Sequence, residues 1–365
     1  MAAVLVPPLV RGAISIDIDD DGFQSYSIDE SLCVGCGICQ GPMNAVKAKR
    51  AGDAKCLLSY QSHDGKGLTR SSSGVGRGFG RLFAERGYRV FGCIYDSEKD
   101  AALTEVDSLR WISCEGRSIF SRDLRRRCHR VRTGRRENRV FGTPCQIAGL
   151  DSVLRRKGTR TRRCSSTLFA MVSPPGFSGP AILPIARARE WGASDVYFRW
   201  NANGWSPLKM MMMTSPSKDY SAVESEDDFY AFFNPGLCCA KSCYECPYRE
   251  RSAADVRMGD YWGGRFAGDQ KGVSMAIVMT DTGAKIMQEL VARGAKSEQF
   301  DLREYWDCQF PYNQGLPLIW DELIADLRAG VDPLSDLRRK YCAGFDQRKK
   351  IDAIKQTFKK LLGKA

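Results

Sequence analysis

The chain has 365 residues, 43% of them hydrophobic, and a formal net charge of +12 at pH 7. This length and composition predict an ordinary globular protein with two or three domains and a sizeable buried core. No run approaches the roughly 20 apolar residues that a membrane helix needs. Residues 1–12 are too short and too interrupted by proline for a secretory signal. The expected location is therefore cytoplasmic, where fifteen cysteines indicate thiolates or metal ligands more than disulfides.

The first cysteine motif occupies residues 33–39 and reads Cys-Val-Gly-Cys-Gly-Ile-Cys. Its three cysteines, Cys33, Cys36 and Cys39, have the spacing of half a bacterial ferredoxin site and predict a [4Fe–4S] cluster. The fourth cysteine and the proline of that motif are absent, because Met43 and Asn44 stand in their places. Cys56 is the first candidate for the fourth ligand. The alternatives are a labile three-ligand cluster or a ligand brought near by the fold: Cys93, Cys114 or Cys128.

The chain next contains a small-residue loop at 71–76, an expected helix from about Arg77 to Arg86 and an expected strand from Tyr88 to Tyr95. Such a loop before a helix N-terminus offers free backbone amides to a phosphate. It lacks the G-x-G-x-x-G dinucleotide fingerprint, and an ordinary strand-to-helix turn explains it equally well.

Two basic runs follow. Ten arginines fall between Arg117 and Arg139, opposed by Asp123 and Glu137 alone, and a second run covers residues 155–163. The net positive charge predicts attraction to anions without choosing among acidic protein, nucleotide, anionic lipid and nucleic acid. The runs are either solvated faces or a docking surface for an acidic partner or an anionic substrate. Few aromatic residues are interleaved with them, so nucleic acid is the less favoured partner.

An apolar strand beginning at Arg139 leads into Thr143-Pro144-Cys145-Gln146 and then a helix. This order places Cys145 at the carboxyl end of a strand, where α/β sheets bind their ligands. By itself Cys145 is either a nucleophile or a structural thiol. The elements expected beyond it are a strand at 168–173, a helix at 178–189, a β-hairpin at 195–213 that turns at Asn203–Gly204, and a helix at 224–233.

The second cysteine cluster begins at Cys238 and is followed by a basic loop, then by Asp260, Gly263 and Gly264. Its cysteines are Cys238, Cys239, Cys243 and Cys246. Cysteines two residues apart on a tight turn direct their sulfurs at one centre, as zinc and iron–sulfur sites require. The alternative is a disulfide framework or buried small side chains. A strand at 273–279, a helix at 282–293 and an amphipathic helix at 346–362 complete the chain. The last of these packs on the body or binds a partner, with membrane-surface binding as the lesser alternative.

Taken together and in order, CVGCGIC, SSSGVG, GTPCQIAGL, YFRWNANGW and SCYECPYRERSAADVRMGDYWGG resemble the coenzyme F420 hydrogenase/dehydrogenase beta subunit family. That family includes the plant 7-hydroxymethyl chlorophyll a reductases, and the resemblance covers roughly residues 30–310. It implies a mixed α/β fold: a flavin-binding α/β core with a small N-terminal ferredoxin-like segment. The expected divisions are an iron–sulfur segment at 1–66, two parts of the flavin domain at 67–160 and 161–318, and a helical tail at 319–365.

The resemblance also implies FAD beside one or two [4Fe–4S] clusters. The N-terminal cluster would take Cys33, Cys36 and Cys39. The cluster next to the flavin would take Cys145, Cys243 and Cys246. The residues expected near FAD are Ser72, Ser73, Gly74, Gly76, Thr143, Pro144, Gln146, Asp255, Gly259 and Asp260.

The chain departs from the family pattern in the expected strand at 168–173. The family usually has a cysteine there, where this chain offers Ala170 or Ser173, and the neighbouring Cys-His-Gly is absent. Either Cys239 or Cys238 replaces the missing ligand, or the inner cluster is incomplete. Val75 also stands where a second glycine of the small-residue loop would be, which crowds the approach of a phosphate.

The function expected from the resemblance is an electron relay. The protein would pass electrons between a hydride-type small molecule, F420 or another, and a one-electron carrier such as ferredoxin or another acidic electron-transfer protein, through FAD and the clusters. No protein acid or base is expected to be catalytic. Two alternatives remain: a non-catalytic zinc or iron–sulfur module that binds a polyanion, and a redox-inactive relative that acts within an assembly.

Overall fold

The computed structural model describes residues 13–19, 21, 23–35, 48–61, 74–96, 101–105, 138–156, 166–171, 193–197, 204–205, 209–214, 220–308, 313–330 and 333–344. Within this part of the chain, no helix is long and apolar enough to cross a membrane. The expected helices at 178–189 and 346–362 fall outside these residues. So do both basic runs, except for residues 138–139 of the first and 155–156 of the second.

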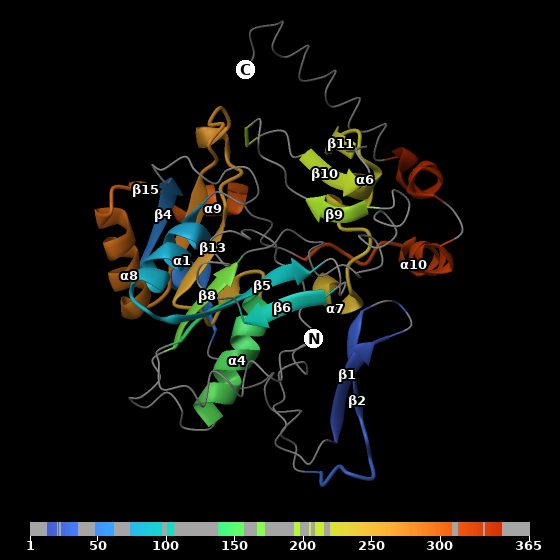
Figure 1. Ribbon diagram of the computed structural model, residues 1–365, viewed down its shortest axis with the longest axis horizontal. Coiled ribbons are helices and arrows are strands. Elements are labelled where there is room, and N and C mark those ends of the chain that lie inside the picture. The colour runs from blue at the N-terminus through green and yellow to red at the C-terminus, as the bar shows by residue number, and fades with distance from the viewer. Residues whose placement is uncertain are drawn as a thin grey trace, which may run out of the picture.

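An eight-stranded mixed sheet forms the centre of the molecule (Figure 1). Its strands, in spatial order, are β15 (Lys296–Gln299), β4 (Cys56–Gln61), β14 (Ser274–Val278), β13 (Val256–Asp260), β8 (Ser166–Met171), β7 (Asn138–Gly142), β5 (Arg89–Asp96) and β6 (Ala101–Glu105). The four strands β13, β8, β7 and β5 run parallel, and the others pair antiparallel. The expected mixed α/β fold is therefore confirmed.

Helices cover both faces of this sheet, and strand β14 shows why. Its alternate residues Ala276 and Val278 pack with α1 (Val75–Glu85) and α8 (Asp281–Ala292) in one apolar cluster. Met275 and Ile277 point the other way and pack with residues near α9 (Leu302–Cys308). Strand side chains alternate between faces, so the four consecutive apolar residues at 275–278 are buried on both sides of the sheet.

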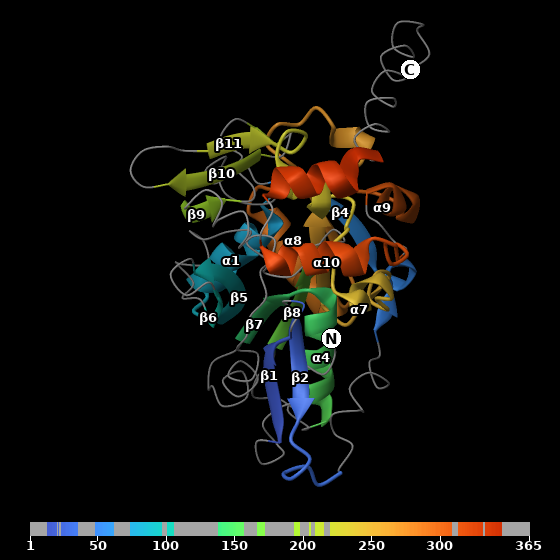
Figure 2. The same ribbon diagram turned by 90° about the vertical axis from the view of Figure 1, so that its right-hand side faces the viewer.

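Smaller elements surround the sheet. Strands β9 (Ala193–Tyr197), β10 (Lys209–Thr214) and β11 (Tyr220–Val223) form a three-stranded antiparallel sheet, and β12 (Arg251–Ser252) pairs with β3 (Lys49–Arg50), which precedes the short helix η2 (Ala51–Asp53). Strands β1 (Ile14–Ile18) and β2 (Gln24–Ile28) form a hairpin that extends from the body (Figures 1 and 2).

A second apolar core is helical. It gathers α6 (Asp228–Phe233), α7 (Lys241–Tyr244), α10 (Trp320–Ala329) and the helix at 334–344. The β1–β2 hairpin joins this core through Phe23, whose ring stacks on Trp320 at 5.9 Å. The helical core therefore connects the N-terminal hairpin to the C-terminal part of the chain.

The expected hairpin at 195–213 is confirmed in its pairing, because β9 pairs antiparallel with β10. Asn203 of its expected turn lies outside the described residues. The backbone amide of Trp205 donates to Gln270 O at 2.9 Å. Trp205 thus contacts the loop before β14. The expected helix at 224–233 begins only at Asp228, after β11.

Candidate functional site

Three segments distant in sequence meet at the carboxyl edge of the parallel strands. Helix α4 (Pro144–Arg156) starts where β7 ends. Helix α1 starts there too, because the amide of Val75 donates to Ser274 Oγ at 3.0 Å and Ser274 pairs with Asp260 at the end of β13. Ligands of α/β sheets bind at this kind of edge. Two helix N-termini with their positive dipole ends therefore lie at one edge of the sheet.

The sequence Thr143-Pro144-Cys145-Gln146 forms the start of α4. The Thr143 amide donates to Gln146 Oε1 at 3.0 Å, which is half of a capping box. Pro144 occupies the first helical position, where its missing N–H costs nothing. Thr143 Oγ1 lies 3.2 Å from Cys145 Sγ, at hydrogen-bonding distance. The residues expected to contact FAD are thus seen to fix the helix start and the thiol of Cys145.

Cys145 and Cys246 lie within electrostatic range of each other. Burial raises the pKa of the Cys145 thiol, and negative charge on Cys246 raises it further. Burial also raises the pKa of Tyr248, and both thiols contribute to that shift. These effects place one tyrosine beside a pair of cysteines that are 101 positions apart in the chain (145 and 246).

The segment that carries Cys246 is held from two sides. Asn313 Nδ2 donates to Cys246 O at 3.2 Å, and Arg249 Nε donates to Asn313 Oδ1 at 3.3 Å. From β13, the guanidinium of Arg257 donates to main-chain carbonyls of the turn that follows Cys246. The position of Cys246 is therefore fixed by the main sheet and by the segment before α10.

The other cysteines of the second cluster lie in the helical core. Cys238, Cys239 and Cys243 are buried there together with Tyr244. Tyr244 donates its hydroxyl hydrogen to Gly236 O at 2.7 Å and accepts from the Cys239 amide at 3.1 Å. Burial raises the pKa of Cys239 to about 11. The structure thus places Cys239, expected as a replacement ligand, among helices rather than with Cys145 and Cys246.

The N-terminus of α1 has open space on one side. Gly74 adopts a left-handed conformation with φ of 97°. The amide of Val75, at the first helical position, is already bound by Ser274 Oγ. A Cβ built at Gly76 would meet nothing within 4 Å. Ser72 and Ser73 lie outside the described residues. The open space at Gly76 leaves room for an anionic group beside the second helical position.

Asp255, Gly259 and Asp260, which were expected near FAD, lie in two different environments. Asp255 is buried, and its Oδ1 accepts a 2.6 Å bond from Thr280 Oγ1. Thr280 caps α8 by accepting from the Gly283 amide, and Gly283 lies so close to Asp255 that a Cβ there would meet its carbonyl oxygen. Gly259 and Asp260 are half-buried at the end of β13. In the described structure Asp255 serves the α8 cap, whereas Gly259 and Asp260 lie at the candidate site.

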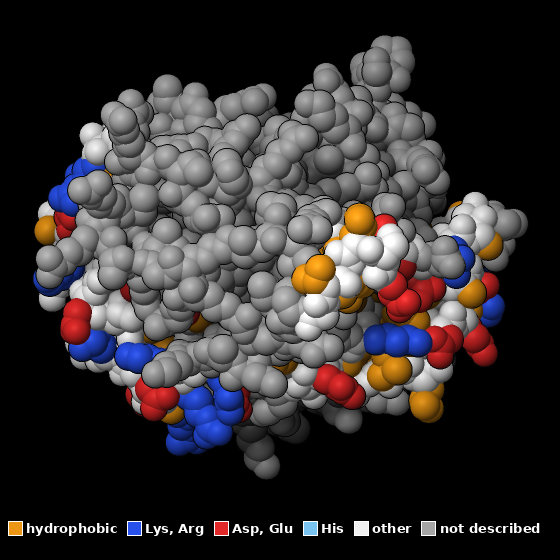
Figure 3. Space-filling view, turned by 90° about the horizontal axis from the view of Figure 1, so that it is seen from below, with side chains coloured by type: hydrophobic (Ala, Val, Ile, Leu, Met, Phe, Trp, Pro, Cys, Tyr) orange, Lys and Arg blue, Asp and Glu red, His pale blue; other side chains and the backbone are white. Residues whose placement is uncertain are grey.

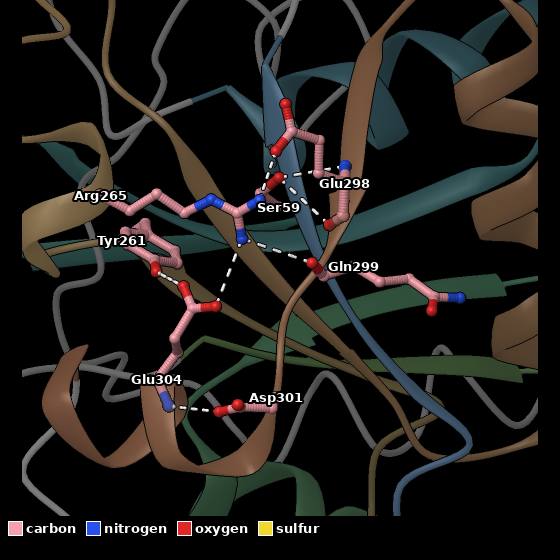
Figure 4. Close-up of polar contacts among 7 residues, drawn as sticks. All are labelled: Ser59, Tyr261, Arg265, Glu298, Gln299, Asp301 and Glu304. Atoms are coloured by element: carbon pink, nitrogen blue, oxygen red, sulfur yellow. Dashed lines mark hydrogen bonds and ion pairs between the residues drawn. The ribbon is translucent and has the colours of Figure 1, made fainter.

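A polar network holds the segment that follows Asp260 (Figure 4). Arg265 donates to Glu298 at 2.6 Å, to Glu304 at 3.3 Å and to Gln299 O at 3.4 Å, and Tyr261 donates to Glu304. The same segment carries Trp262, whose ring stacks on Trp205 at 5.4 Å. These contacts join the segment after β13 to β15 and α9.

The N-terminal cysteine motif is only partly described. Cys33 is exposed, and Cys36 and Cys39 lie outside the described residues. Cys56 lies on β4, where it packs against the core between the sheet and helices α1 and α8. Figures 1 and 2 show β4 and the segment after β2 in different parts of the molecule. The described structure therefore does not bring Cys56, expected as a fourth ligand, to Cys33.

Within the described residues, no group of three or more His, Cys, Asp or Glu side chains has a geometry that could hold a metal ion. The assembled part of the expected ligand set is the pair Cys145 and Cys246. Sequence reasoning missed Tyr248, Arg257 and Asn313. Only Tyr248 could have been found from the sequence, because it lies two positions after Cys246. Arg257 and Asn313 are distant in sequence and contact this segment only in the folded chain.

Comparison with known proteins bears on this edge of the sheet. Residues 136–299, from β7 to β15, match the family model that describes the C terminus of the coenzyme F420 hydrogenase/dehydrogenase beta subunit. The resemblance to this family is confirmed. The F420 hydrogenase/dehydrogenase match spans Cys145, Cys246 and the end of β13, and thus the parts of the site that the fold assembles.

Other comparisons add little to the F420 hydrogenase/dehydrogenase match. No curated protein matches the chain. A chain in a xenon-derivatised structure of the F420-reducing [NiFe] hydrogenase complex from Methanosarcina barkeri aligns with a TM-score of 0.46 and 13% identity, covering 79% of this chain and 92% of that chain. Similarity at this level carries no argument about function.

Proposed function

We propose that this protein is an iron–sulfur flavoprotein oxidoreductase that passes electrons between a hydride-type small molecule and a one-electron carrier. The family match supports a redox function of the F420 hydrogenase/dehydrogenase beta subunit kind. The observation that carries the proposal is that Cys145, at the N-terminus of α4 and the carboxyl edge of the sheet, lies within electrostatic range of Cys246.

The residues at this edge fit a thiolate-bound anionic group. Two cysteines lie near each other, with the positive end of α4 beside one of them. The buried cation Arg257 lies within electrostatic range of Cys246. Cys145 and Cys246 would bind iron, with Cys243 three positions before Cys246 as the next ligand. The family's strand cysteine has no counterpart in β8, whose sequence reads Ser-Thr-Leu-Phe-Ala-Met, so the fourth ligand is not a cysteine of that strand.

The N-terminus of α1 fits the phosphates of FAD. Gly76 has open space beside it, and Gly74 supplies the left-handed turn that directs the chain into the helix. The Val75 amide is bound by Ser274 Oγ, so the phosphates would bind at the second helical position, beside Gly76. FAD exchanges two electrons as a hydride and releases them singly, whereas an iron–sulfur cluster carries one electron at a time. The chain's own task is then to hold the two groups side by side at one sheet edge and to exclude water from between them.

The partner is proposed to be a ferredoxin or another acidic electron-transfer protein in the cytoplasm. The net charge of +12 suits such a partner. The arginine-rich runs lie outside the described residues, except for their ends. On the face shown in Figure 3, the described side chains include both basic and acidic groups, side by side. The arginine-rich runs, rather than this face, would therefore supply the excess positive charge.

Purification without oxygen tests the proposal. The protein is expected to be brown, with bound flavin, iron and acid-labile sulfide, because thiolate-bound iron–sulfur clusters and flavin both absorb visible light. The measurements are the visible spectrum, flavin released on denaturation, and iron and zinc per chain. A colourless protein that contains zinc, lacks flavin and binds polyanions in a strongly salt-dependent way would replace this proposal with the non-catalytic module.

A further inference from the structure

Arg257 links the main sheet to the turn that follows Cys246. The residue lies on β13 and is 3% exposed. Its guanidinium donates to the carbonyl oxygens of Arg249 at 2.5 Å, Tyr248 at 3.4 Å and Arg251 at 3.4 Å. One side chain thus binds three of the five residues that come directly after Cys246. The planar fork of arginine can do this, whereas a lysine ammonium on its flexible stem cannot match the spacing.

The charge of Arg257 is incompletely compensated within the described structure. Arginine remains protonated, and burial of an ion costs several kcal/mol unless other groups compensate it. The three carbonyls compensate part of the charge, and the Tyr305 ring lies 5.8 Å from the guanidinium carbon. Among the described residues no carboxylate forms an ion pair with Arg257, and its Nε makes no hydrogen bond. Tyr305, Cys246 and Glu250 are the acidic groups within electrostatic range. Burial raises the pKa of Tyr305, so its phenol stays neutral and does not compensate the charge.

Glu250 is exposed, so solvent screens its charge. Cys246 is half-buried and lies beside Cys145. Turn anchoring alone would not require a full charge, because neutral amide donors satisfy carbonyl groups without the desolvation cost. The combination of a buried cation and a neighbouring cysteine pair therefore indicates an anionic occupant at the pair.

We propose that Arg257 is the positioning residue of the Cys145–Cys246 centre. Its three hydrogen bonds fix the turn at 248–251 so that Cys246 faces Cys145. Its positive charge stabilises the anionic, thiolate-bound group at that centre. The first role stands on the contacts alone, and the second rests on the proposed function.

Two substitutions separate these roles. Arg257→Met removes both the hydrogen bonds and the charge, whereas Arg257→Lys keeps the charge and loses most of the hydrogen bonds. Arg293→Met is the matched control, because Arg293 is a partly exposed arginine that binds Glu85 and Glu289 on the other side of the sheet. The first measurement is trypsin cleavage of the iron-free full chain after Arg249 and Arg251, followed by mass spectrometry. The second is the midpoint potential of the iron-loaded protein.

Both Arg257 variants are expected to be cleaved at these two sites at least about 10-fold faster than the unchanged chain, because loss of the three bonds costs more than about 1.4 kcal/mol of local stability. The Arg293→Met control is expected to be cleaved at the original rate. Equal cleavage in all four proteins would overturn the positioning role.

The midpoint potential is expected to fall in Arg257→Met and to stay near the original value in Arg257→Lys, because a nearby positive charge favours the reduced, more anionic state. Equal potentials in both variants would overturn the charge role. If Arg257→Met does not retain iron, retention by Arg257→Lys supports the charge role and loss from both contradicts it. If the unchanged chain binds no iron, the proposed function and the charge role fail together, and the cleavage result still decides the positioning role.

Discussion

Replacing Cys145 by alanine is expected to remove about half of the bound iron while flavin stays bound, if each of two sites holds a four-iron cluster. The substitution removes a thiol at the second position of α4, beside Cys246. The cap formed by Thr143 and Gln146 does not use the Cys145 side chain, so the helix start should persist. Iron and acid-labile sulfide per chain, flavin content and the circular dichroism spectrum measure the three parts of this expectation.

Cys342→Ala is the matched control for that experiment. Cys342 is a fully buried cysteine of the helical core, where it lies near Cys238. Its loss creates a small cavity, and a destabilisation of about 1–2 kcal/mol is expected without loss of iron. An unchanged iron content in Cys145→Ala, or equal iron loss in both variants, would show that Cys145 is not a specific ligand.

A leucine at Gly76 is expected to weaken flavin binding at least about 10-fold, a loss of roughly 1.4 kcal/mol or more, with the iron content unchanged. The Cβ at this position would meet no protein atom within 4 Å. The helix itself should gain stability, since leucine is a better helix former than glycine. The added side chain would instead fill the space proposed for the FAD phosphates. Flavin titration of the iron-containing protein measures the effect.

Gly315→Leu is the control for the Gly76 substitution, because a Cβ at Gly315 also meets nothing within 4 Å and the residue lies on the segment before α10. Its flavin affinity is expected to equal that of the unchanged chain. If Gly76→Leu binds flavin as tightly as the unchanged chain, the flavin does not bind at the start of α1, and that turn has a structural role only.

The sequence predicted those parts of the site whose signals are local. The order of Thr143, Pro144 and Gln146 predicts a helix start after a strand, and the structure shows half of a capping box at that point. The apolar run at 273–279 predicts a strand, and β14 lies there with both faces buried. In each case the neighbouring residues determine the backbone conformation with little help from distant parts of the chain.

The rest of the site depends on contacts between distant segments. The short spacing between Cys239 and Cys246 suggested that both bind one metal centre. In the structure Cys239 lies in the helical core, where its amide donates a hydrogen bond to Tyr244. The family resemblance implied that Asp255 lies near FAD. In the structure its carboxylate accepts a hydrogen bond from Thr280, which is 25 positions later. Nothing near Arg257 in the sequence showed that it would bind the turn after Cys246. Contacts between distant segments determine the surroundings of each of these residues. The periodicity of a sequence carries no information about such contacts.

The most direct test of the central claim is a cysteine alkylation footprint. The iron-free protein and the protein loaded with iron and sulfide are treated anaerobically with iodoacetamide, and modification at each cysteine is measured by mass spectrometry. Loading is expected to protect Cys145 and Cys246, both partly exposed in the unloaded chain, to the same extent, because they bind one group at the sheet edge. Equal alkylation of Cys145 before and after loading, with protection confined to Cys246 or to the N-terminal cysteines, would contradict the claim that these segments form one iron centre.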